Sequence, residues 1–188
     1  MRKGLIPFLR NGGIAVMQTD TVYGIVASAR SRRAVSRLFA LRRSAGKRKP
    51  FIILIPRLTS LREFSVPLTR KNKIFLAKVW PGPVSVILPC ASGRFAYLRR
   101  GTKTLAFRLP KPLWLRTLLA RTGPLVAPSA NPEGKPPART IGEARAYFKE
   151  NVSWYEAGKR GSGHPSALVS LVGREPVVLR KGKTNILK

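Results

Sequence analysis

Residues 12–27 read GGIAVMQTDTVYGIVA, and this stretch decides the fold. Two apolar runs, 14–17 and 23–27, are separated by a polar Thr-Asp-Thr segment. Short apolar runs bounded by polar or turn-forming residues are typical of β-strands. We therefore expect a strand, a polar turn and a second extended segment here.

The residues that follow predict a helix and then a buried strand. Residues 31–41 carry apolar side chains at helical spacing, and Ser31 is available as the N-cap. The basic run RRSAGKRK at 42–49 contains a glycine and ends before a proline, which favours a loop. The apolar run 51–55 is typical of a strand covered on both faces. Strand, helix and strand in this order predict a right-handed crossover in an α/β fold.

The remainder of the chain shows further strand and helix patterns. Neither a repeat nor a linker interrupts it, and 188 residues suffice for one hydrophobic core, so we expect a single α/β domain over residues 1–188. Helices are expected near 61–64, 71–79, 114–120 and 141–150, and strands in WPGPVSVILP, TLAFRLP and PLVAPSA and at 167–172 and 177–180.

The charge is extreme for an ordinary metabolic enzyme. The 37 Lys and Arg residues outnumber 7 Asp and Glu residues, which gives a formal net charge of +30. Such an excess predicts a polyanionic partner, with tRNA or another RNA as the expected one. Because the basic residues are scattered through the whole chain, a general drift of composition toward basic residues stays open as the alternative.

Composition also bears on the compartment. Cys90 is the only cysteine, so no disulfide can form within the chain. The apolar stretch at the start is interrupted by Pro7 and Arg10, which leaves it too short for the core of a signal peptide. No apolar run approaches the roughly 18 residues needed to cross a bilayer. We expect a cytoplasmic protein with no membrane partner.

Common catalytic motifs are missing. GKT at 182–184 is not a P-loop, because Val177 stands where the first glycine belongs, and GSGHPS at 161–166 is a partial match to GxGxxG. His164 is the only histidine, so HExxH metal sites and Ser/His catalysis with a spare histidine are hard to build. We expect no metal site and no classical hydrolase chemistry.

Three blocks together carry a resemblance to a known family. They are QTDTVYGI at 18–25, WPGPVSVIL at 80–88 and GPLVAPSANPEGKPPA at 123–138, joined by TLAFRLP and PSALVSLVGREPVVLRKG. In this order and spacing they resemble the YrdC/TsaC family of threonylcarbamoyl-adenylate synthases over most of the chain, about residues 5–182. The resemblance implies a twisted open mixed sheet with flanking helices and a concave basic surface. We expect the short bacterial form of the family.

The resemblance also implies a reaction. Bicarbonate and the amine of L-threonine form a carbamate, which attacks the α-phosphate of ATP and releases pyrophosphate with Mg²⁺ present. The product, threonylcarbamoyl-adenylate, passes to a tRNA threonylcarbamoyl transferase complex. Such chemistry depends on positioning and cations more than on an acid–base pair, and no tightly bound cofactor is expected.

The basic loop holds the main departure from the family. The family has Lys-x-Arg followed by Lys-Pro or Asn-Pro, where this chain reads RRSAGKRKP at 42–50. Arg42 keeps the charge of the lysine, but Ser44 stands where the arginine is expected. The resemblance implies that Arg42 and Arg43 together replace the pair as catalytic and ATP-binding residues, and that Lys49 contacts phosphate. A solvated basic loop is the alternative at each position.

For L-threonine, the resemblance implies contacts from Thr21, Arg108 and Ser129. A planar guanidinium binds a carboxylate in bidentate fashion, so Arg108 is expected to hold the carboxylate of the substrate. The alternative is an internal salt bridge, for which this chain offers few acids. For Thr21 the alternative is a turn hydroxyl that binds its own backbone. Tyr23 is expected in the core.

For ATP, Ser129 and Asn131 match the Ser-x-Asn motif of the family at a strand end, and the resemblance assigns both to catalysis. Turn formation is the alternative for these two residues. Ala167 and Ser170 depart from the family, which has a threonine and an aspartate there. The full set implied for ATP is Arg42, Arg43, Lys49, Thr104, Asn131, Thr140 and Arg180.

Two other functions stay open. An RNA-binding protein could keep this fold without catalysis, which the net charge of +30 and the departure at Ser44 favour. Its RNA affinity would fall steeply with salt. A module acting on carbamoyl phosphate in hydrogenase cofactor assembly ranks last, because that activity normally occurs in a longer chain with zinc fingers and an acylphosphatase part.

Overall fold

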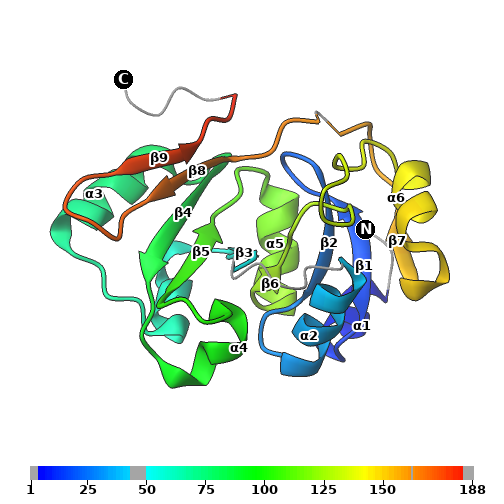
Figure 1. Cartoon of the computed structure of the whole chain (residues 1–188), viewed down its shortest axis with the longest axis horizontal. Coiled ribbons are helices and arrows are strands. Elements are labelled where there is room, and N and C mark those ends of the chain that lie inside the picture. The colour runs from blue at the N-terminus through cyan, green and yellow to red at the C-terminus, as the bar shows by residue number, and fades with distance from the viewer. Residues whose placement is uncertain (1–3, 43–49, 162, 184–188) are drawn as a thin grey trace.

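The computed structural model describes residues 4–42, 50–161 and 163–183 (Figure 1). The strands are β1 (Ile14–Gln18), β2 (Tyr23–Ser28), β3 (Ile52–Leu54), β4 (Val84–Pro89), β5 (Thr104–Arg108), β6 (Leu125–Val126), β7 (Trp154–Glu156), β8 (Ala167–Ser170) and β9 (Val177–Arg180). The α-helices are α1 (Leu5–Arg10), α2 (Arg32–Leu41), α3 (Arg70–Val79), α4 (Ala96–Arg99), α5 (Leu113–Thr122) and α6 (Ile141–Phe148). Short 3-10 helices are η1 (Leu58–Phe64), η2 (Gly93–Phe95) and η3 (Lys149–Asn151).

The described strands form one mixed sheet in the order β7-β1-β2-β6-β3-β5-β4-β8-β9. The pairs β1–β7, β3–β5 and β4–β8 are parallel, and the other neighbours are antiparallel. The expected order of β2, α2 and β3 is present, and these two strands run parallel, but β6 lies between them. Figure 1 shows β9 and β7 at opposite edges of the sheet. The expectation of a single open mixed sheet with flanking helices is confirmed.

The two faces of the sheet bury separate apolar cores. Helices α2, α3, α4 and α6 pack on one face, where Tyr23 and Phe107 are almost fully buried. Helices α1 and α5 pack on the other face, where Leu9 and Leu118 have no exposed surface. Tyr23 is 1% exposed, so its expected role in the core is confirmed.

Helices α1 and α5 leave part of their face uncovered. Ile52, Ala106 and Ile87 are paired in register across β3, β5 and β4, so their side chains point to the same side of the sheet. Leu54, two residues farther along β3 and therefore on the same face, belongs to the core under α5. A cavity of about 500 Å³ lies over the uncovered row of three side chains.

Four short elements were not expected from the sequence, namely α1, η2, α4 and β7. Helix α1 has six residues with Pro7 inside it, so its sequence carries less than two turns of periodicity. It is stabilised by tertiary burial, because Leu5 and Leu9 are 0% exposed against α5 and the sheet. Residues 61–64, expected as a helix, form the end of η1, which is a 3-10 helix.

Within the described residues, every helix is too short and too polar to cross a bilayer.

Candidate functional site

The larger of two adjoining cavities lies on the uncovered part of the sheet and has a volume of about 500 Å³. Its floor is apolar and consists of Ile52, Ile87 and Ala106, with Leu168 from β8 beside them. A flat apolar floor of this kind can accept the face of an aromatic base, since it offers dispersion contacts without competing polar groups.

Arginines surround this floor. Arg42, Arg100 and Arg180 line the cavity, and Glu133 is the acid among its lining residues. The Nε of Arg42 donates a hydrogen bond to the carbonyl oxygen of Asn131 at 2.8 Å, which holds the guanidinium in place. Burial lowers the pKa of Arg42 and Glu133 raises it, but a guanidinium remains protonated at neutral pH. The cavity therefore combines an apolar floor with a cationic rim.

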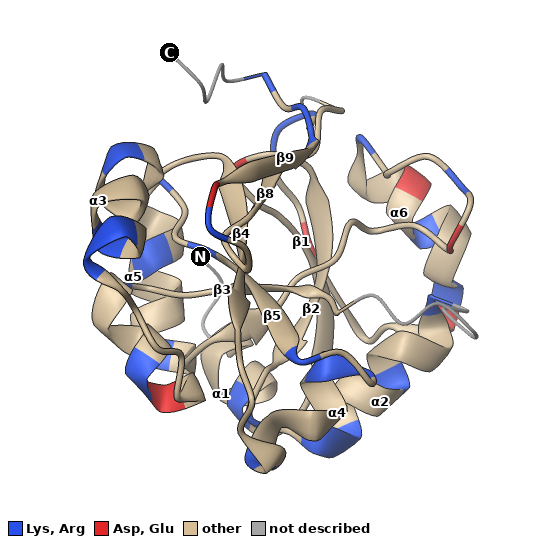
Figure 2. Ribbon diagram, turned by 60° about the vertical axis from the view of Figure 1, so that its left-hand side comes forward, with Lys and Arg blue, Asp and Glu red and all other residues tan. Residues whose placement is uncertain are grey.

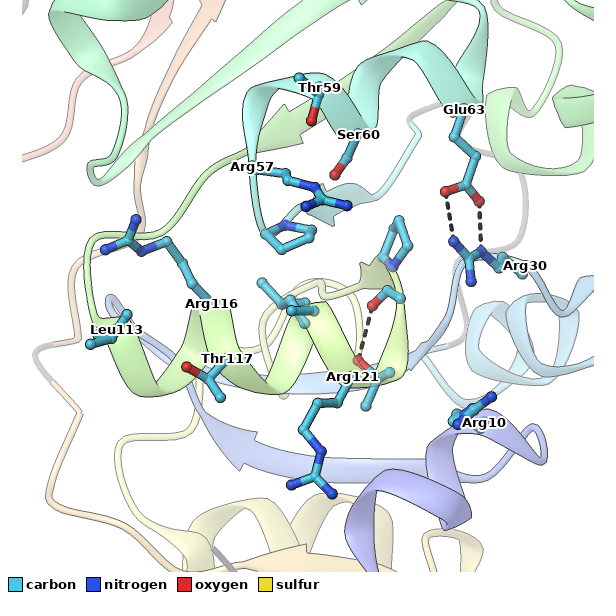
Figure 3. Close-up of a pocket in the computed structure, with 16 residues that line it drawn as sticks. Arg10, Arg30, Arg57, Thr59, Ser60, Glu63, Leu113, Arg116, Thr117 and Arg121 are labelled. Atoms are coloured by element: carbon cyan, nitrogen blue, oxygen red, sulfur yellow. Dashed lines mark hydrogen bonds and ion pairs between the residues drawn. The ribbon is translucent and has the colours of Figure 1, made fainter.

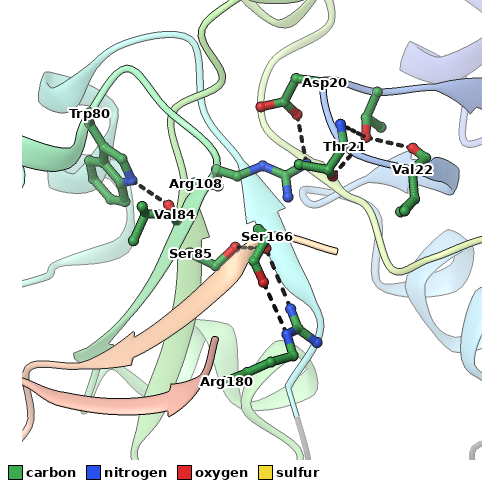
Figure 4. Close-up of polar contacts among 10 residues, drawn as sticks. Asp20, Thr21, Val22, Trp80, Val84, Ser85, Arg108, Ser166 and Arg180 are labelled. Atoms are coloured by element: carbon green, nitrogen blue, oxygen red, sulfur yellow. Dashed lines mark hydrogen bonds and ion pairs between the residues drawn. The ribbon is translucent and has the colours of Figure 1, made fainter. Parts of the chain in front are cut away.

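The smaller cavity, of about 50 Å³, adjoins the larger one, because Ile52, Ser129 and Arg180 line both. Its other lining residues include Thr21 from the turn after β1 and Arg108 from the end of β5. Figure 4 shows Asp20 and Thr21, on one turn, close to Arg108 from β5, and Arg180 from β9 in contact with Ser166. The two cavities form one cleft with a wide apolar end and a narrow polar end.

Arg108 is buried and forms an ion pair with Asp20. Its Nη2 lies 2.9 Å from Oδ1 of Asp20, and each of the two side chains is 5% exposed. The internal salt bridge that the sequence left open as the alternative for Arg108 is therefore present, because the Thr-Asp-Thr turn brings one of the few acids, Asp20, over the end of β5. Burial lowers the pKa of Arg108, the nearby Asp20 carboxylate raises it and Arg180 lowers it. The ion pair keeps a guanidinium charged in a site that water hardly reaches.

Several buried polar atoms at this end of the cleft lack a hydrogen-bond partner among the described residues. They include Nε of Arg108 and both carboxylate oxygens of Asp20. The contact between Arg108 and Asp20 is close enough for an ion pair but is not aligned as a hydrogen bond. Unsatisfied buried polar atoms cost stability, so their gathering here indicates a place where a polar ligand completes the bonding.

A second group of polar contacts holds the side chain of Arg180 in place. The hydroxyl groups of Ser85 and Ser166 are 2.8 Å apart, and both residues are buried. The Nε of Arg180 donates to the carbonyl oxygen of Ser166 at 3.0 Å (Figure 4). These contacts direct Arg180 from β9, at the edge of the sheet, toward the junction of the two cavities.

The backbone of β2 holds the Ser129 segment in place. Gly24 and Ser129 form an isolated antiparallel bridge, the N–H of Ile25 donates to Pro128 O at 3.0 Å, and the N–H of Ala130 donates to Tyr23 O at 2.8 Å. A Cβ on Gly24 would lie 3.1 Å from Cγ2 of Thr19, so glycine allows this close approach. Ser129 is therefore fixed relative to the Thr-Asp-Thr turn.

The structure brings together five of the residues implied by the sequence, and these line the cleft: Thr21, Arg42, Arg108, Ser129 and Arg180. Asn131 lines neither cavity, but its carbonyl oxygen accepts the hydrogen bond from Arg42. Its side-chain amide donates to the carbonyl oxygens of Pro132 and Lys135 at 2.9 and 2.7 Å. The sequence argument did not include Asp20, although it stands inside the quoted Thr-Asp-Thr segment.

Other implied residues lie elsewhere. Thr104 and Thr140 line neither cavity of the cleft. Arg43, Ser44 and Lys49 fall in 43–49, outside the described residues, so their assigned roles stay predictions.

Thr140 has a structural role that the sequence argument did not assign to it. It is the N-cap of α6, where its hydroxyl accepts a hydrogen bond from the N–H of Glu143 at 3.1 Å. Glu143 in turn accepts from the N–H of Arg139 at 2.7 Å. A capping box differs only in that its acid accepts from the N–H of the cap residue itself rather than from the residue before it.

We expect Thr140→Ala to lower the free energy of unfolding by about 1 kcal/mol, because it removes a cap. Thr69→Ala is the matched control, since Thr69 caps α3 by the same contact, to the N–H of Asn72 at 3.1 Å. Urea unfolding of both variants checks the capping effect, and an unchanged stability of Thr140→Ala would contradict it. A KM for ATP raised only in Thr140→Ala would support the nucleotide contact implied by the sequence.

Comparison with known proteins identifies the family. The family model for Sua5, YciO and YrdC proteins, described as telomere recombination, matches residues 7–182. A threonylcarbamoyl-AMP synthase of Hahella chejuensis is 32% identical over 166 residues, which cover 87% of this chain and 89% of the relative. One of Bacillus subtilis is 30% identical over 177 residues, which cover 93% of this chain and 51% of the relative.

A solved structure gives the same result. The structure of Pyrococcus abyssi Sua5 complexed with L-threonine matches this chain with a TM-score of 0.86 and 28% identity, over 94% of this chain and 52% of that chain. This chain thus spans about half the length of the Bacillus and Pyrococcus relatives and most of the Hahella relative.

Fold and site define an α/β protein with an arginine-lined cleft on the open face of a mixed sheet. The chain belongs to the Sua5/YciO/YrdC family.

Proposed function

We propose that this chain is a threonylcarbamoyl-AMP synthase, which joins ATP, L-threonine and bicarbonate into threonylcarbamoyl-adenylate and pyrophosphate. The observation that carries the proposal is the buried Arg108, whose Nε lacks a hydrogen-bond partner among the described residues at the narrow end of an arginine-rimmed cleft. Relatives that bear this name match most of the chain, and a relative of known structure is complexed with L-threonine.

The narrow end of the cleft suits the amino acid. The free N–H groups of the Arg108 guanidinium can bind the carboxylate of L-threonine, while Asp20 keeps the guanidinium in position. Thr21 and Ser129 line the same small cavity and offer hydroxyl groups for the polar atoms of the substrate. The carboxylate thus fixes where the amine of the amino acid lies.

The wide end suits the nucleotide. The apolar floor of Ile52, Ile87 and Ala106 can accept the adenine ring, and the rim of arginines can bind the phosphates. Because the two cavities share Ser129 and Arg180, an amino acid in one and a nucleotide in the other meet at their junction. This arrangement brings the amino acid close to the α-phosphate.

The reaction proceeds in two steps. The threonine amine attacks the carbon of bicarbonate, and loss of water leaves the carbamate. An oxygen of the carbamate then attacks the α-phosphorus of ATP, a new P–O bond forms, and the bond to the β-phosphate breaks to release pyrophosphate. The guanidinium groups of Arg42 and Arg180 would stabilise the negative charge that develops on the phosphate oxygens.

Mg²⁺ fits this site as a companion of ATP. In the described part of the chain there is no cluster of three or more His, Cys, Asp or Glu side chains that could hold a metal ion. Mg²⁺ is commonly bound through substrate phosphates and water with few protein ligands, and there it neutralises phosphate charge. We propose that it enters with the nucleotide.

We likewise propose that a tRNA threonylcarbamoyl transferase complex accepts the adenylate, and that the protein is cytoplasmic.

The proposal is tested by pyrophosphate release from purified protein with ATP, Mg²⁺ and bicarbonate, with and without L-threonine. We expect release that requires both threonine and bicarbonate, and mass spectrometry should detect threonylcarbamoyl-adenylate. Pyrophosphate release that does not depend on threonine, or the absence of the adenylate, would contradict the proposed function.

Arg42→Ala is expected to raise the KM for ATP by about 10-fold to 100-fold. The variant loses a charge-assisted contact to phosphate, and such a contact contributes about 1.5–3 kcal/mol. Arg37→Ala is the matched control, because Arg37 is an exposed arginine on the same helix and lines neither cavity of the cleft. Initial rates at varied ATP concentration measure the effect, and equal KM values in the two variants would remove Arg42 from the nucleotide site.

A further inference from the structure

A separate cavity of about 900 Å³ lies between η1 and α5, away from the cleft (Figure 3). It shares no lining residue with the two cavities of the cleft. We call it the η1–α5 groove. Its basic lining residues come from α1, the end of β2, η1 and α5, and they are Arg10, Arg30, Arg57, Arg116 and Arg121.

The groove carries a strong excess of positive charge. Glu63 is the acid among its described lining residues, and Arg30 already binds it through Nε at 2.6 Å and Nη2 at 2.8 Å. Arg30 fits against the backbone of Gly123, where a Cβ would lie 2.9 Å from its Nη1. Among the described residues, no ion pair involves any of the other four arginines. A net charge of about four positive units remains along the groove.

Helix α5 has two different faces. Leu115, Leu118 and Leu119 are buried in the core, while Arg116, Thr117 and Arg121 line the groove. The Nε of Arg116 is buried and lacks a hydrogen-bond partner among the described residues. A buried guanidinium nitrogen of this kind is normally satisfied, so its N–H indicates an anionic oxygen as the missing partner.

The form of the groove suits a polymer better than a small anion. Arg10, Arg57 and Arg121 are exposed and stand on three separate segments, so their charges follow an open surface. Trp114, which follows the lining residue Leu113 at the start of α5, is 48% exposed. Exposed aromatic rings beside arginines are what single-stranded RNA uses for stacking, whereas an inorganic anion needs only the charges.

We propose that the η1–α5 groove binds the phosphate backbone of RNA, on a surface separate from the cleft that holds ATP and L-threonine. The formal net charge of +30, with Lys and Arg on helices over both faces of the sheet (Figure 2), attracts a polyanion to the whole protein, and the groove gathers five arginines that can hold it. RNA binding is measured without ATP or threonine, so this proposal stands or fails independently of the proposed function.

The test compares two double variants with the same net charge. Arg116→Glu/Arg121→Glu reverses two groove charges on α5, and Lys73→Glu/Lys78→Glu reverses two exposed charges on α3 that line neither the groove nor the cleft. Each pair lowers the formal net charge by 4, from +30 to +26. Fluorescence anisotropy with a labelled tRNA transcript gives the Kd over a range of salt concentrations.

We expect the groove variant to bind the transcript at least tenfold more weakly than wild type, and the α3 variant to stay within threefold. The slope of log K against log salt should fall by about 1.5 in the groove variant alone, as two lost phosphate contacts predict. Equal losses in the two variants would show that net charge alone determines binding, and would overturn the proposal. So would weak binding of wild type at low salt.

Further measurements distinguish a loss of RNA binding from misfolding and from binding of another partner at the groove. Arg57→Glu changes the exposed residue just before η1 and should weaken RNA binding by itself, while formation of the adenylate stays at the wild-type rate in every groove variant.

Competition with ATP tests where the RNA binds. Saturating ATP at constant ionic strength should leave the Kd for RNA within twofold, and a tenfold loss of affinity would place RNA in the cleft instead. If the groove variant lost binding to phosphatidylserine vesicles but kept RNA binding, the groove would be a membrane surface and the proposal would be wrong.

Discussion

Arg108→Gln is expected to lower kcat/KM for L-threonine by about 10²-fold to 10⁴-fold in the pyrophosphate assay. The glutamine removes two charge-assisted hydrogen bonds to the substrate carboxylate, each of which contributes about 1.5–3 kcal/mol. The total of about 3–6 kcal/mol converts at 1.4 kcal/mol per tenfold change. Arg108→Lys keeps the charge but loses the planar fork, so it should fall between wild type and the glutamine variant.

Loss of stability could imitate this result, because Arg108→Gln leaves the buried carboxylate of Asp20 without its cation. Breaking a buried ion pair on one side costs about 3–5 kcal/mol. The double variant Asp20→Asn/Arg108→Gln removes both charges and should regain most of the free energy of unfolding. It should not regain activity, since the carboxylate of the substrate still has no guanidinium to bind.

Urea unfolding and threonine-dependent pyrophosphate release, measured on the same four proteins, separate the two effects. Recovery of activity in the double variant would mean that Arg108 acts only by neutralising Asp20. That result would remove Arg108 from the threonine site.

Leu118→Ala is expected to lower the free energy of unfolding by about 2–5 kcal/mol. Leu118 is 0% exposed and packs between α5 and the sheet, so the truncation leaves a cavity that its neighbours fill only in part. Leu113→Ala is the matched control, because it is the same substitution on the same helix at a residue that is 70% exposed.

The control should change stability by less than about 0.5 kcal/mol, which is usual for surface positions. Denaturant unfolding with equal m-values in both variants checks the comparison. Similar losses in the two variants would show that α5 does not bury the face assigned to it. A small loss in Leu118→Ala alone would show that the core under α5 closes around the missing side chain.

Much of the fold could be predicted where local patterns are strong. Residues 14–17 and 23–27 were expected as extended, and they form most of β1 and β2. Helix α2 begins after Ser31, whose hydroxyl accepts from the N–H of Ala34 at 3.2 Å, as its sequence indicated. The position of β6 between β2 and β3 could not be predicted, because strand order depends on contacts between residues far apart in the chain.

The candidate site could be predicted only in part, because it too depends on contacts between residues far apart in the chain. Arg108 and Thr21 stood out because the sequence resembles a family in which matching positions bind substrate, and both line the narrow cavity. Asp20 did not, because its role depends on an ion pair with a residue 88 positions later, and no local pattern marks such a pair. The cap formed by Thr140 was overlooked although Glu143 follows it at capping-box spacing.

The backbone bonds that join the Ser129 segment to β2 have a consequence for the size of the proposed threonine site. Thr21 and Ser129 both line a space of about 50 Å³, and the N–H of Ile25 and the carbonyl of Tyr23 join the segments that carry them. Paired main chain moves less readily than an unpaired loop. The bonds therefore hold Thr21 and Ser129 at a constant separation and help to limit the size of the amino acid that the proposed threonine site accepts.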